Sequence, residues 1–283
     1  MRELKPTNLR AEAEVGDGQS GGTVDQQLPW IDVHCHINML EASAEESVKS
    51  ALQQGVQRLI TIGTCPDDHS TVLALAQAHA PYVYCTLGVH PHEARLFDSK
   101  VEGFLRQHLT DPRVVAVGEI GLDYYYNHSE PQVQRENFHR QLELALEFDL
   151  PVEIHTRDAE KDTVDILKSY GGQVRGLLHC FTGTQWLADE ALALGLNLSF
   201  SGVVTFKNAE ALRQVVKETP MDRLHVETDS PFLAPVPMRG KKNIPDYVIH
   251  VAQKVAELKE LSLAELSQQT RLNALKMFPR LQW

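Results

Sequence analysis

The sequence predicts an α/β protein that forms one (β/α)₈ barrel over residues 29–283. Three observations favour this fold. Short, apolar, β-rich runs alternate with amphipathic helical patterns from Trp30 to the end of the chain. Eight such units in about 250 residues match the usual size of this barrel. The first run ends in His34-Cys35-His36 and no Gly-rich phosphate turn follows it, which disfavours the rival fold, a doubly wound open sheet.

The eight predicted strands are mostly continuous apolar runs rather than alternating ones. This pattern is typical of parallel strands that helices cover, because neither face of such a strand meets water. In chain order, the predicted strands are Trp30–His36, Arg58–Ile62, Tyr82–Gly88, Val114–Gly118, Val152–His155, Val174–His179, Asn197–Phe200 and Leu224–Glu227.

Helical patterns separate and follow these strands. Three capping boxes predict helix starts, and two glycines predict helix ends. Apolar residues at helical spacing predict further helices near 138–146, 187–194, 212–216 and 248–258. The capping boxes are Ser43 with Glu46, Ser99 with Glu102 and Ser262 with Glu265, and the glycines are Gly55 and Gly195.

The composition is that of an ordinary globular protein with an acidic balance. The chain has 283 residues, and its formal net charge of −11 comes from 27 Lys and Arg against 38 Asp and Glu. These values exclude collagen-like, coiled-coil and wholly disordered proteins. The acidity disfavours a protein that coats nucleic acid with a basic face. It remains compatible with an enzyme that grips a few phosphates through metals.

The composition of residues 1–28 differs from that of the rest of the chain. The stretch is polar, holds four glycines between 16 and 22 and lacks an apolar period, so it predicts a flexible N-terminal tail. It has no apolar segment of the kind that a secretory signal needs. No run of about 18 apolar residues predicts a membrane helix. The four cysteines form no CxxC pair, which favours reduced thiols and a cytoplasmic location, and no obligate protein partner is evident.

Metal-binding residue types lie at the ends of five predicted strands. In a (β/α)₈ barrel, the carboxyl ends of the strands meet at one mouth, where active sites lie. His34 and His36 are two apart on the first strand, so they point to the same face, which Asp32 shares. The other candidates follow the fourth, fifth, sixth and eighth strands, and they are Glu119, His155, His179 and Asp229.

This set of candidates predicts a metal centre. Four imidazoles and two carboxylates are more ligands than one metal usually takes, whereas two metals that share a bridging carboxylate would use them all. Mixed nitrogen and oxygen ligands suit Zn²⁺, Mn²⁺, Fe²⁺ or Ni²⁺ better than Ca²⁺. Mg²⁺ also fits if water completes its shell.

Seven collinear motifs between Ile31 and Phe278 carry a family resemblance. The chain resembles the TatD family of metal-dependent deoxyribonucleases, within the amidohydrolase-like barrels. The motifs are Asp32-Val33-His34-Cys35-His36, Gly88-Val89-His90-Pro91-His92, Gly118-Glu119-Ile120-Gly121-Leu122-Asp123-Tyr124-Tyr125, His155-Thr156-Arg157-Asp158-Ala159, His179-Cys180-Phe181-Thr182-Gly183, Ser201-Gly202-Val203-Val204-Thr205-Phe206-Lys207 and Glu227-Thr228-Asp229-Ser230-Pro231.

The resemblance implies how the candidate ligands divide between two divalent metal ions, which would be Mg²⁺, Mn²⁺ or Zn²⁺. One ion would be held on each side of a shared carboxylate. The first ion would be held by His34, His36 and Asp229, the second by His155 and His179, and Glu119 would bridge them.

The resemblance also implies catalytic and substrate-binding roles. Asp229 would orient or deprotonate the attacking water, and Glu119 would act through its bridge. His90 would contact a substrate phosphate. Arg157 lies two residues after a ligand, where its guanidinium can pair with a phosphate.

The implied activity is hydrolysis of DNA phosphodiester bonds, as a 3'-5' exonuclease that favours single strands or frayed ends. A pocket at a barrel mouth admits a frayed strand more easily than an intact duplex. An alternative is a hydrolase of the same fold acting on another ester or amide, such as D-aminoacyl-tRNA, whose deacylation is known for some members of the family. A binding or scaffold protein that has kept the fold but lost catalytic activity is disfavoured, because all six candidate metal ligands are present.

Two further features leave the substrate contacts open. Tyr124, Tyr125 and Tyr126 either stack on bases or pack on the barrel. Met238 and Ile244 stand where many members of the family carry polar residues, which changes the expected contacts at the rim but not at the metal site.

Overall fold

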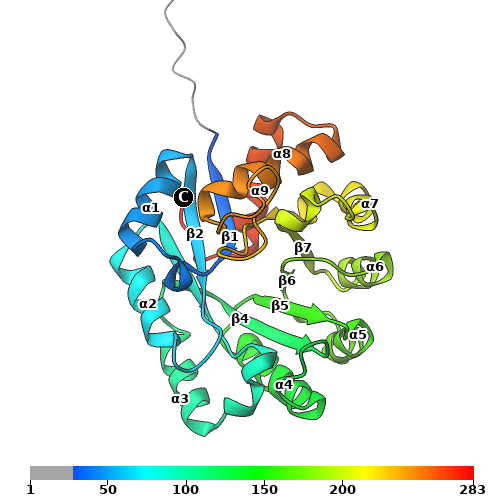
Figure 1. The fold of residues 1–283 in the computed structure, drawn as a ribbon. Helices are drawn as coiled ribbons and strands as arrows, with labels where there is room; N and C mark the ends of the chain where they lie inside the picture. Colours follow the sequence, from blue (N-terminus) through cyan, green and yellow to red (C-terminus); the bar gives the residue numbers. More distant parts are fainter. Residues whose placement is uncertain (1–27) are drawn as a thin grey trace, which may run out of the picture.

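Eight parallel strands form a closed ring in the computed structural model, which describes residues 28–283 (Figure 1). Each strand pairs with the next along the chain. The ring closes where Asp229 N donates to His34 O at 2.9 Å and His36 N donates to Ser230 O at 2.8 Å. The strands are β1 (Trp30–Cys35), β2 (Val56–Ile62), β3 (Val83–Leu87), β4 (Val114–Asp123), β5 (Val152–Arg157), β6 (Gly176–Leu178), β7 (Asn197–Phe200) and β8 (Leu224–Val226).

Helices form the outer layer of the barrel (Figure 1). One helix follows each of the first seven strands, and two follow β8. None of the described helices is long and apolar enough to cross a membrane. The helices are α1 (Ala44–Gln53), α2 (His69–Ala78), α3 (Ser99–His108), α4 (Pro131–Glu147), α5 (Glu160–Ser169), α6 (Gln185–Ala193), α7 (Glu210–Glu218), α8 (Val248–Lys259) and α9 (Leu263–Met277).

The predicted barrel is confirmed, with differences at the element ends. The structure shows both the Ser43 and the Ser262 capping boxes. The Ser99 box was wrong: the N-cap of α3 is Asp98, whose carboxylate accepts hydrogen bonds from two backbone N–H groups at 2.9 Å. The sequence patterns named above had not indicated α2 or α5. Residues 1–27 of the predicted tail lie outside the described residues, and Leu28 packs half-buried against the core.

Two apolar clusters hold the barrel together. The larger cluster lies between the strands and the surrounding helices, and it includes Cys35, which points away from the barrel interior. The smaller cluster joins buried residues of β1 to β4 and of β6 to Phe278 and Leu281 near the C-terminus. The C-terminal segment therefore fills one end of the barrel interior, and the polar candidates occupy the other end, at the mouth.

Glycines in β4 allow the unusually close approach of the strand that carries Glu119. A Cβ added at Gly118 would lie 2.8 Å from the Cβ of Glu153 on β5. At Gly121, the backbone has a φ of +134°, and an added Cβ would lie 2.0 Å from the carbonyl oxygen of His155. Because only glycine fits both restrictions at 121, it lets β4 continue to Asp123, past its predicted end at Gly118.

We predict that Gly121→Ala destabilises the protein by at least about 2 kcal/mol, because it combines a strained φ with overpacking. The matched control is Gly103→Ala, since Gly103 lies in α3 and an added Cβ would meet nothing within 4 Å. That control should stabilise the protein by about 0.5–1 kcal/mol. Urea unfolding measures both, and equal effects would contradict the close-approach argument.

Candidate metal centre

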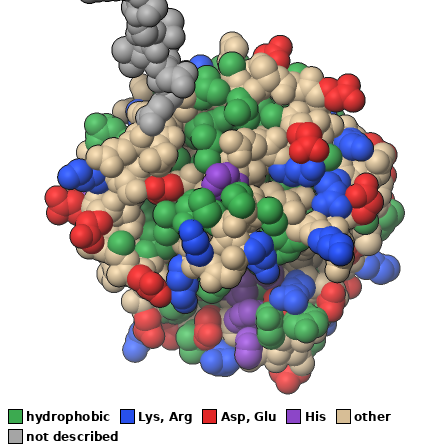
Figure 2. Space-filling model, turned by 45° about the horizontal axis from the view of Figure 1, so that its top comes forward, with side chains coloured by type: hydrophobic (Ala, Val, Ile, Leu, Met, Phe, Trp, Pro, Cys, Tyr) green, Lys and Arg blue, Asp and Glu red, His purple; other side chains and the backbone are tan. Residues whose placement is uncertain are grey.

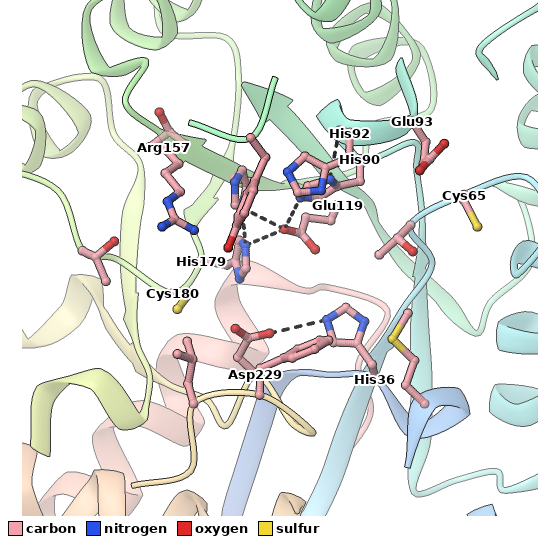
Figure 3. Close-up of a pocket in the computed structure, with 18 of the residues that line it drawn as sticks. His36, Cys65, His90, His92, Glu93, Glu119, Arg157, His179, Cys180 and Asp229 are labelled. Carbon is pink, nitrogen blue, oxygen red and sulfur yellow. Dashed lines mark hydrogen bonds and ion pairs between the residues drawn. The ribbon is translucent and has the colours of Figure 1, made fainter. Parts of the chain in front are cut away.

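Five of the six predicted ligands line a cavity of about 680 Å³ at the carboxyl ends of the strands, and the sixth, His34, is fully buried behind them. Figure 2 shows histidine side chains inside a hollow of the surface, with Lys and Arg side chains beside it. In Figure 3, Glu119 lies in the middle of this cavity, between Arg157 on one wall and the pair of Asp229 and His36. The structure therefore brings residues from β1, β4 and β5 and from the turns after β6 and β8 to one place.

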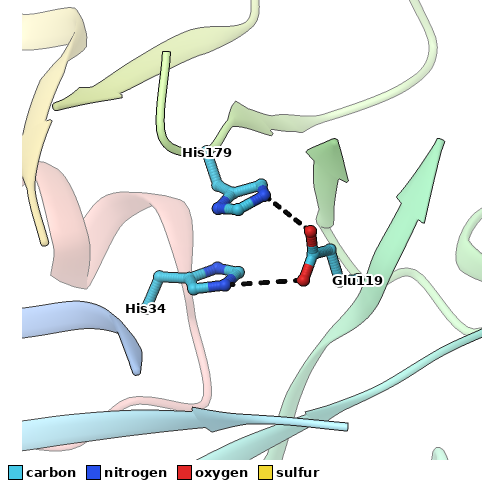
Figure 4. Close-up of side chains that lie close together, drawn as sticks. All are labelled: His34, Glu119 and His179. Carbon is cyan, nitrogen blue, oxygen red and sulfur yellow. Dashed lines mark ion pairs between the residues drawn. The ribbon is translucent and has the colours of Figure 1, made fainter. Parts of the chain in front are cut away.

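Glu119 is the centre of the cluster, and its two oxygens face different groups. Its Oε1 lies 2.7 Å from His179 Nε2, 3.1 Å from His155 Nδ1 and 3.3 Å from His90 Nε2. Its Oε2 lies 3.6 Å from His34 Nε2 (Figure 4). One carboxylate thus separates His34 from the three imidazoles at its other oxygen.

A second group lies beside the first, where β1 meets the turn after β8. Asp229 Oδ1 is 3.4 Å from His36 Nε2 and 3.9 Å from His34 Nε2. Asp229 has a φ of +54°, a left-handed backbone that Asp and Asn tolerate better than most residues. This backbone turns its carboxylate towards the imidazoles of β1.

Charge in the cluster is balanced by the imidazoles themselves. Although burial alone would raise it, the pKa of Glu119 is held well below its ordinary value by His179 and His90. Burial opposes a charge on His179 as well, yet Glu119 raises the pKa of His179 well above its ordinary value. Burial and the neighbouring His179 lower the pKa of His34, whose ring stacks on that of His179 at 3.9 Å. The two stacked imidazoles therefore differ in how readily each is protonated.

These residues fit divalent metal ions. His34 Nε2 is buried and has no hydrogen-bond partner among residues 28–283, although it faces two carboxylates. Three overlapping groups of side chains could each hold a cation with one ligand atom per residue. These groups are His34, His36 and Asp229; His34, Glu119 and His179; and His90, Glu119 and His155.

Three of the imidazoles also contact a carboxylate behind them. His34 Nδ1 lies 2.6 Å from Glu153 Oε2, and His155 Nε2 lies 3.0 Å from Asp123 Oδ2. His179 Nδ1 lies 3.5 Å from Glu227 Oε1. Such a partner fixes which ring nitrogen carries the proton, and it leaves the other nitrogen free to bind a metal.

Of these three carboxylates, only Asp123 is indicated by the sequence, where its place after Glu119 fits either a partner of a ligand imidazole or a helix cap. Glu153 and Glu227 were missed, although each is fully buried. For Glu153 the signal was the strand period: it lies two residues before the predicted ligand His155 on β5, and residues two apart on a strand face the same side. Burial raises the pKa of Glu153 and of Glu227, which agrees with their place inside the barrel.

The two predicted substrate contacts also lie at the cavity. His90 lies within the cluster rather than at its edge. Its Nε2 is 3.3 Å from Glu119 Oε1. Arg157 is exposed at the end of β5, and its side chain has no hydrogen bond or ion pair within the described chain. Its guanidinium instead covers the ring of Tyr125, at 3.9 Å from the ring centre.

Comparison with known proteins places the chain in a family. The family model described as "TatD related DNase" matches residues 31–279. The chain belongs to this family. It is 40% identical to an uncharacterized metal-dependent hydrolase, YabD, of Bacillus subtilis, over 88% of this chain and 98% of that protein. It is 38% identical to the "3'-5' ssDNA/RNA exonuclease TatD" of Erwinia amylovora, with the same two coverages.

A solved structure of the family has the same fold. The crystal structure of YjjV, a TatD homologue from Escherichia coli, superposes with a TM-score of 0.83 at 30% identity, and it covers 88% of this chain and 98% of that one. This TatD-family chain is accordingly a metal-dependent hydrolase with a (β/α)₈ barrel.

We predict that Glu153→Leu lowers metal affinity about 10–100-fold, the usual effect of losing a carboxylate behind a ligand imidazole. Glu153→Gln should lose less, because its amide oxygen can still accept a hydrogen bond from His34 Nδ1. Competition with a chromophoric chelator measures the affinity.

The unfolding midpoint in chelator is the control for this prediction. Leucine leaves the buried Nδ1 of His34 without a hydrogen-bond partner, so Glu153→Leu should be about 1–3 kcal/mol less stable than wild type without metal, and Glu153→Gln should lose less. Unchanged metal affinity in Glu153→Leu would show that the 2.6 Å contact has no bearing on the cluster.

Proposed function

We propose that this protein is a two-metal phosphodiesterase that removes nucleotides from single-stranded or frayed DNA ends, in the 3'-5' direction. One observation carries the two-metal part: one oxygen of Glu119 faces His179 and His155, and the other faces His34 on the opposite side. A carboxylate in that position can bridge two cations.

The ligands divide between two proposed metal sites, one on each side of the Glu119 carboxylate. One cation, with Mg²⁺, Mn²⁺ or Zn²⁺ as candidates, would lie between Glu119 and the group at β1. The other would lie between Glu119 and the imidazoles of β5 and of the turn after β6. Bound cations would supply charge stabilisation and a water of lowered pKa. The residues are His34, His36 and Asp229 for the first site, and His155 and His179 for the second.

The remaining residues act on the water and on the substrate. The carboxylate of Asp229 accepts a proton from the attacking water, since it lies at the mouth beside the first site. The free N–H groups of Arg157 bind a phosphate. Burial lowers the pKa of His90 to about 4, so its imidazole is neutral near pH 7 and can hydrogen-bond a phosphate oxygen without carrying a charge of its own.

Single-stranded nucleic acid is favoured as the substrate. The cavity of about 680 Å³ suits one or two nucleotides rather than a duplex. An Erwinia relative is named a 3'-5' ssDNA/RNA exonuclease, which supports the same substrate class here. A cytoplasmic location stays a prediction from the sequence.

The test compares substrates side by side in Mg²⁺, Mn²⁺ or Zn²⁺. Single-stranded DNA, duplex DNA, RNA and a D-aminoacyl ester are offered to the metal-loaded protein, and end labels report the direction of cleavage. We expect single-stranded DNA to be shortened fastest from its 3' end, and chelator to abolish the reaction. Hydrolysis of the ester alone would overturn the proposal.

Glu119→Ala should reduce metal content from two ions per chain to at most one and should lower kcat more than His34→Ala or His155→Ala does. Elemental analysis of the dialysed protein measures the content. The matched control is Glu93→Ala, because Glu93 lines the same cavity but pairs with Arg95. A Glu119→Ala protein that keeps both ions and full activity would rule out the bridge.

Asp229→Asn should fold normally, keep at least the second metal and lower kcat by about 10²–10⁴-fold, because an amide cannot accept the proton. Asn is also tolerated at the φ of +54°. KM should change much less than kcat. If kcat stays near the wild-type value, Asp229 has no part in proton transfer.

A further inference from the structure

Two exposed tyrosines and an arginine form an aromatic surface at the rim of the cavity. Tyr125 is 57% exposed and Tyr126 is 51% exposed, both large values for tyrosine rings. The guanidinium carbon of Arg157 lies 3.9 Å from the ring centre of Tyr125 and 4.8 Å from that of Tyr126. Tyr126 and Arg157 both line the cavity that holds the metal cluster. We call these three residues the tyrosine–arginine platform.

The platform is held in place by the same carboxyl group that contacts a candidate ligand. Asp123 Oδ1 accepts hydrogen bonds from the backbone N–H groups of Tyr125 and Tyr126, at 3.0 and 2.9 Å. Its other oxygen contacts His155 Nε2 at 3.0 Å. The two rings are therefore presented on a fixed turn next to the metal cluster, so binding a planar group there needs little ordering of the chain.

The neighbouring Tyr124 differs from these two tyrosines, because its contacts are those of a structural residue. Its ring is half-buried against the core, and its hydroxyl donates to Asp162 at 2.8 Å. Tyr125 and Tyr126 lack such burial, and no hydroxyl hydrogen bond of theirs is found in the described chain. Of the two readings left open by the sequence, packing fits Tyr124, and stacking on a ligand fits the other two.

We propose that the tyrosine–arginine platform is a nucleobase subsite, on which a base of the substrate strand stacks while the Arg157 N–H groups bind the adjoining phosphate. This inference rests on the proposed function and names how its substrate is held. Aromatic rings and guanidinium planes stack on any base, which gives affinity without sequence preference. A chain with a net charge of −11 gains little from long-range attraction to a polyanion, so contacts of this short-range kind have to contribute.

The experiment compares two short single-stranded oligonucleotides that differ only in whether the residues at the 3' end carry bases or are abasic. Phosphorothioate linkages block cleavage, so that fluorescence anisotropy gives Kd with the metal-loaded full chain. In wild type, the base-bearing oligonucleotide should bind about 5- to 150-fold more tightly, which is a stacking contribution of about 1–3 kcal/mol.

The decisive variant is the double substitution Tyr125→Leu with Tyr126→Leu. The ratio of the two Kd values should fall close to one, while the Kd of the abasic oligonucleotide changes little. The matched control is Tyr82→Leu, because Tyr82 is also an exposed tyrosine, at 38%, but lies just before the start of β3, away from the mouth. Tyr82→Leu should keep the wild-type ratio, and so should Tyr125→Phe with Tyr126→Phe.

A wild-type ratio near one, or a ratio that survives in the double leucine variant, would overturn the platform. Failure of the proposed function has a different signature, since the unmodified oligonucleotides would then stay intact in every metal tested. A protein that cleaves both oligonucleotides with equal KM would keep the phosphodiesterase proposal and refute the base subsite.

Discussion

A buried carboxylate, that of Glu119, is the constraint on which the mouth of this barrel depends. It is only 4% exposed, and an isolated ionised carboxylate at such a depth is very unfavourable. Imidazoles on both sides compensate it, and they come from β1, from β5 and from the turns after β3 and β6. Those strands have to end at the same level for this to happen, which parallel pairing around a closed ring provides. The glycines of β4 are also required for this arrangement, because they let the strand that carries Glu119 lie close to β5.

A second tier of acids below the cluster explains why the imidazoles hold their orientation. Glu153 and Glu227 are fully buried in a barrel whose interior apolar side chains usually fill, and Asp32 is fully buried where β1 meets the end of β8. Glu153 and Glu227 contact imidazoles, whereas Asp32 accepts hydrogen bonds from Thr228 N at 2.9 Å and from its hydroxyl at 2.5 Å. The interior therefore gives up apolar packing at the mouth end, and Phe278 and Leu281 supply it at the other end. Stability and chemistry are separated along the barrel axis.

The sequence was sufficient for the fold and for the position of the cluster, because both follow from local patterns. Apolar runs mark strands, and polar residues after them fall at one mouth by the rules of parallel pairing. The length of β4 was not predictable in this way, since Gly118 and Gly121 resemble strand breakers until β5 is placed beside them. The role of Glu153 was hidden for a similar reason: its partner His34 is 119 residues away, and a single acid in an apolar run gives no sign of which imidazole it meets.

The charge at the mouth connects metal loading to substrate binding. Without metal, the imidazoles balance the carboxylates of Glu119 and Asp229, in a protein that is acidic as a whole. Two divalent cations, as proposed, would carry more positive charge than these two carboxylates carry negative charge, so the local field would become more positive. The effect would be confined to about the screening length of 8–10 Å. Within that distance the cations attract the phosphate, and beyond it the neighbouring bases would have to be held by uncharged surfaces. The exposed rings of Tyr125 and Tyr126 lie at the rim, where such a surface is needed.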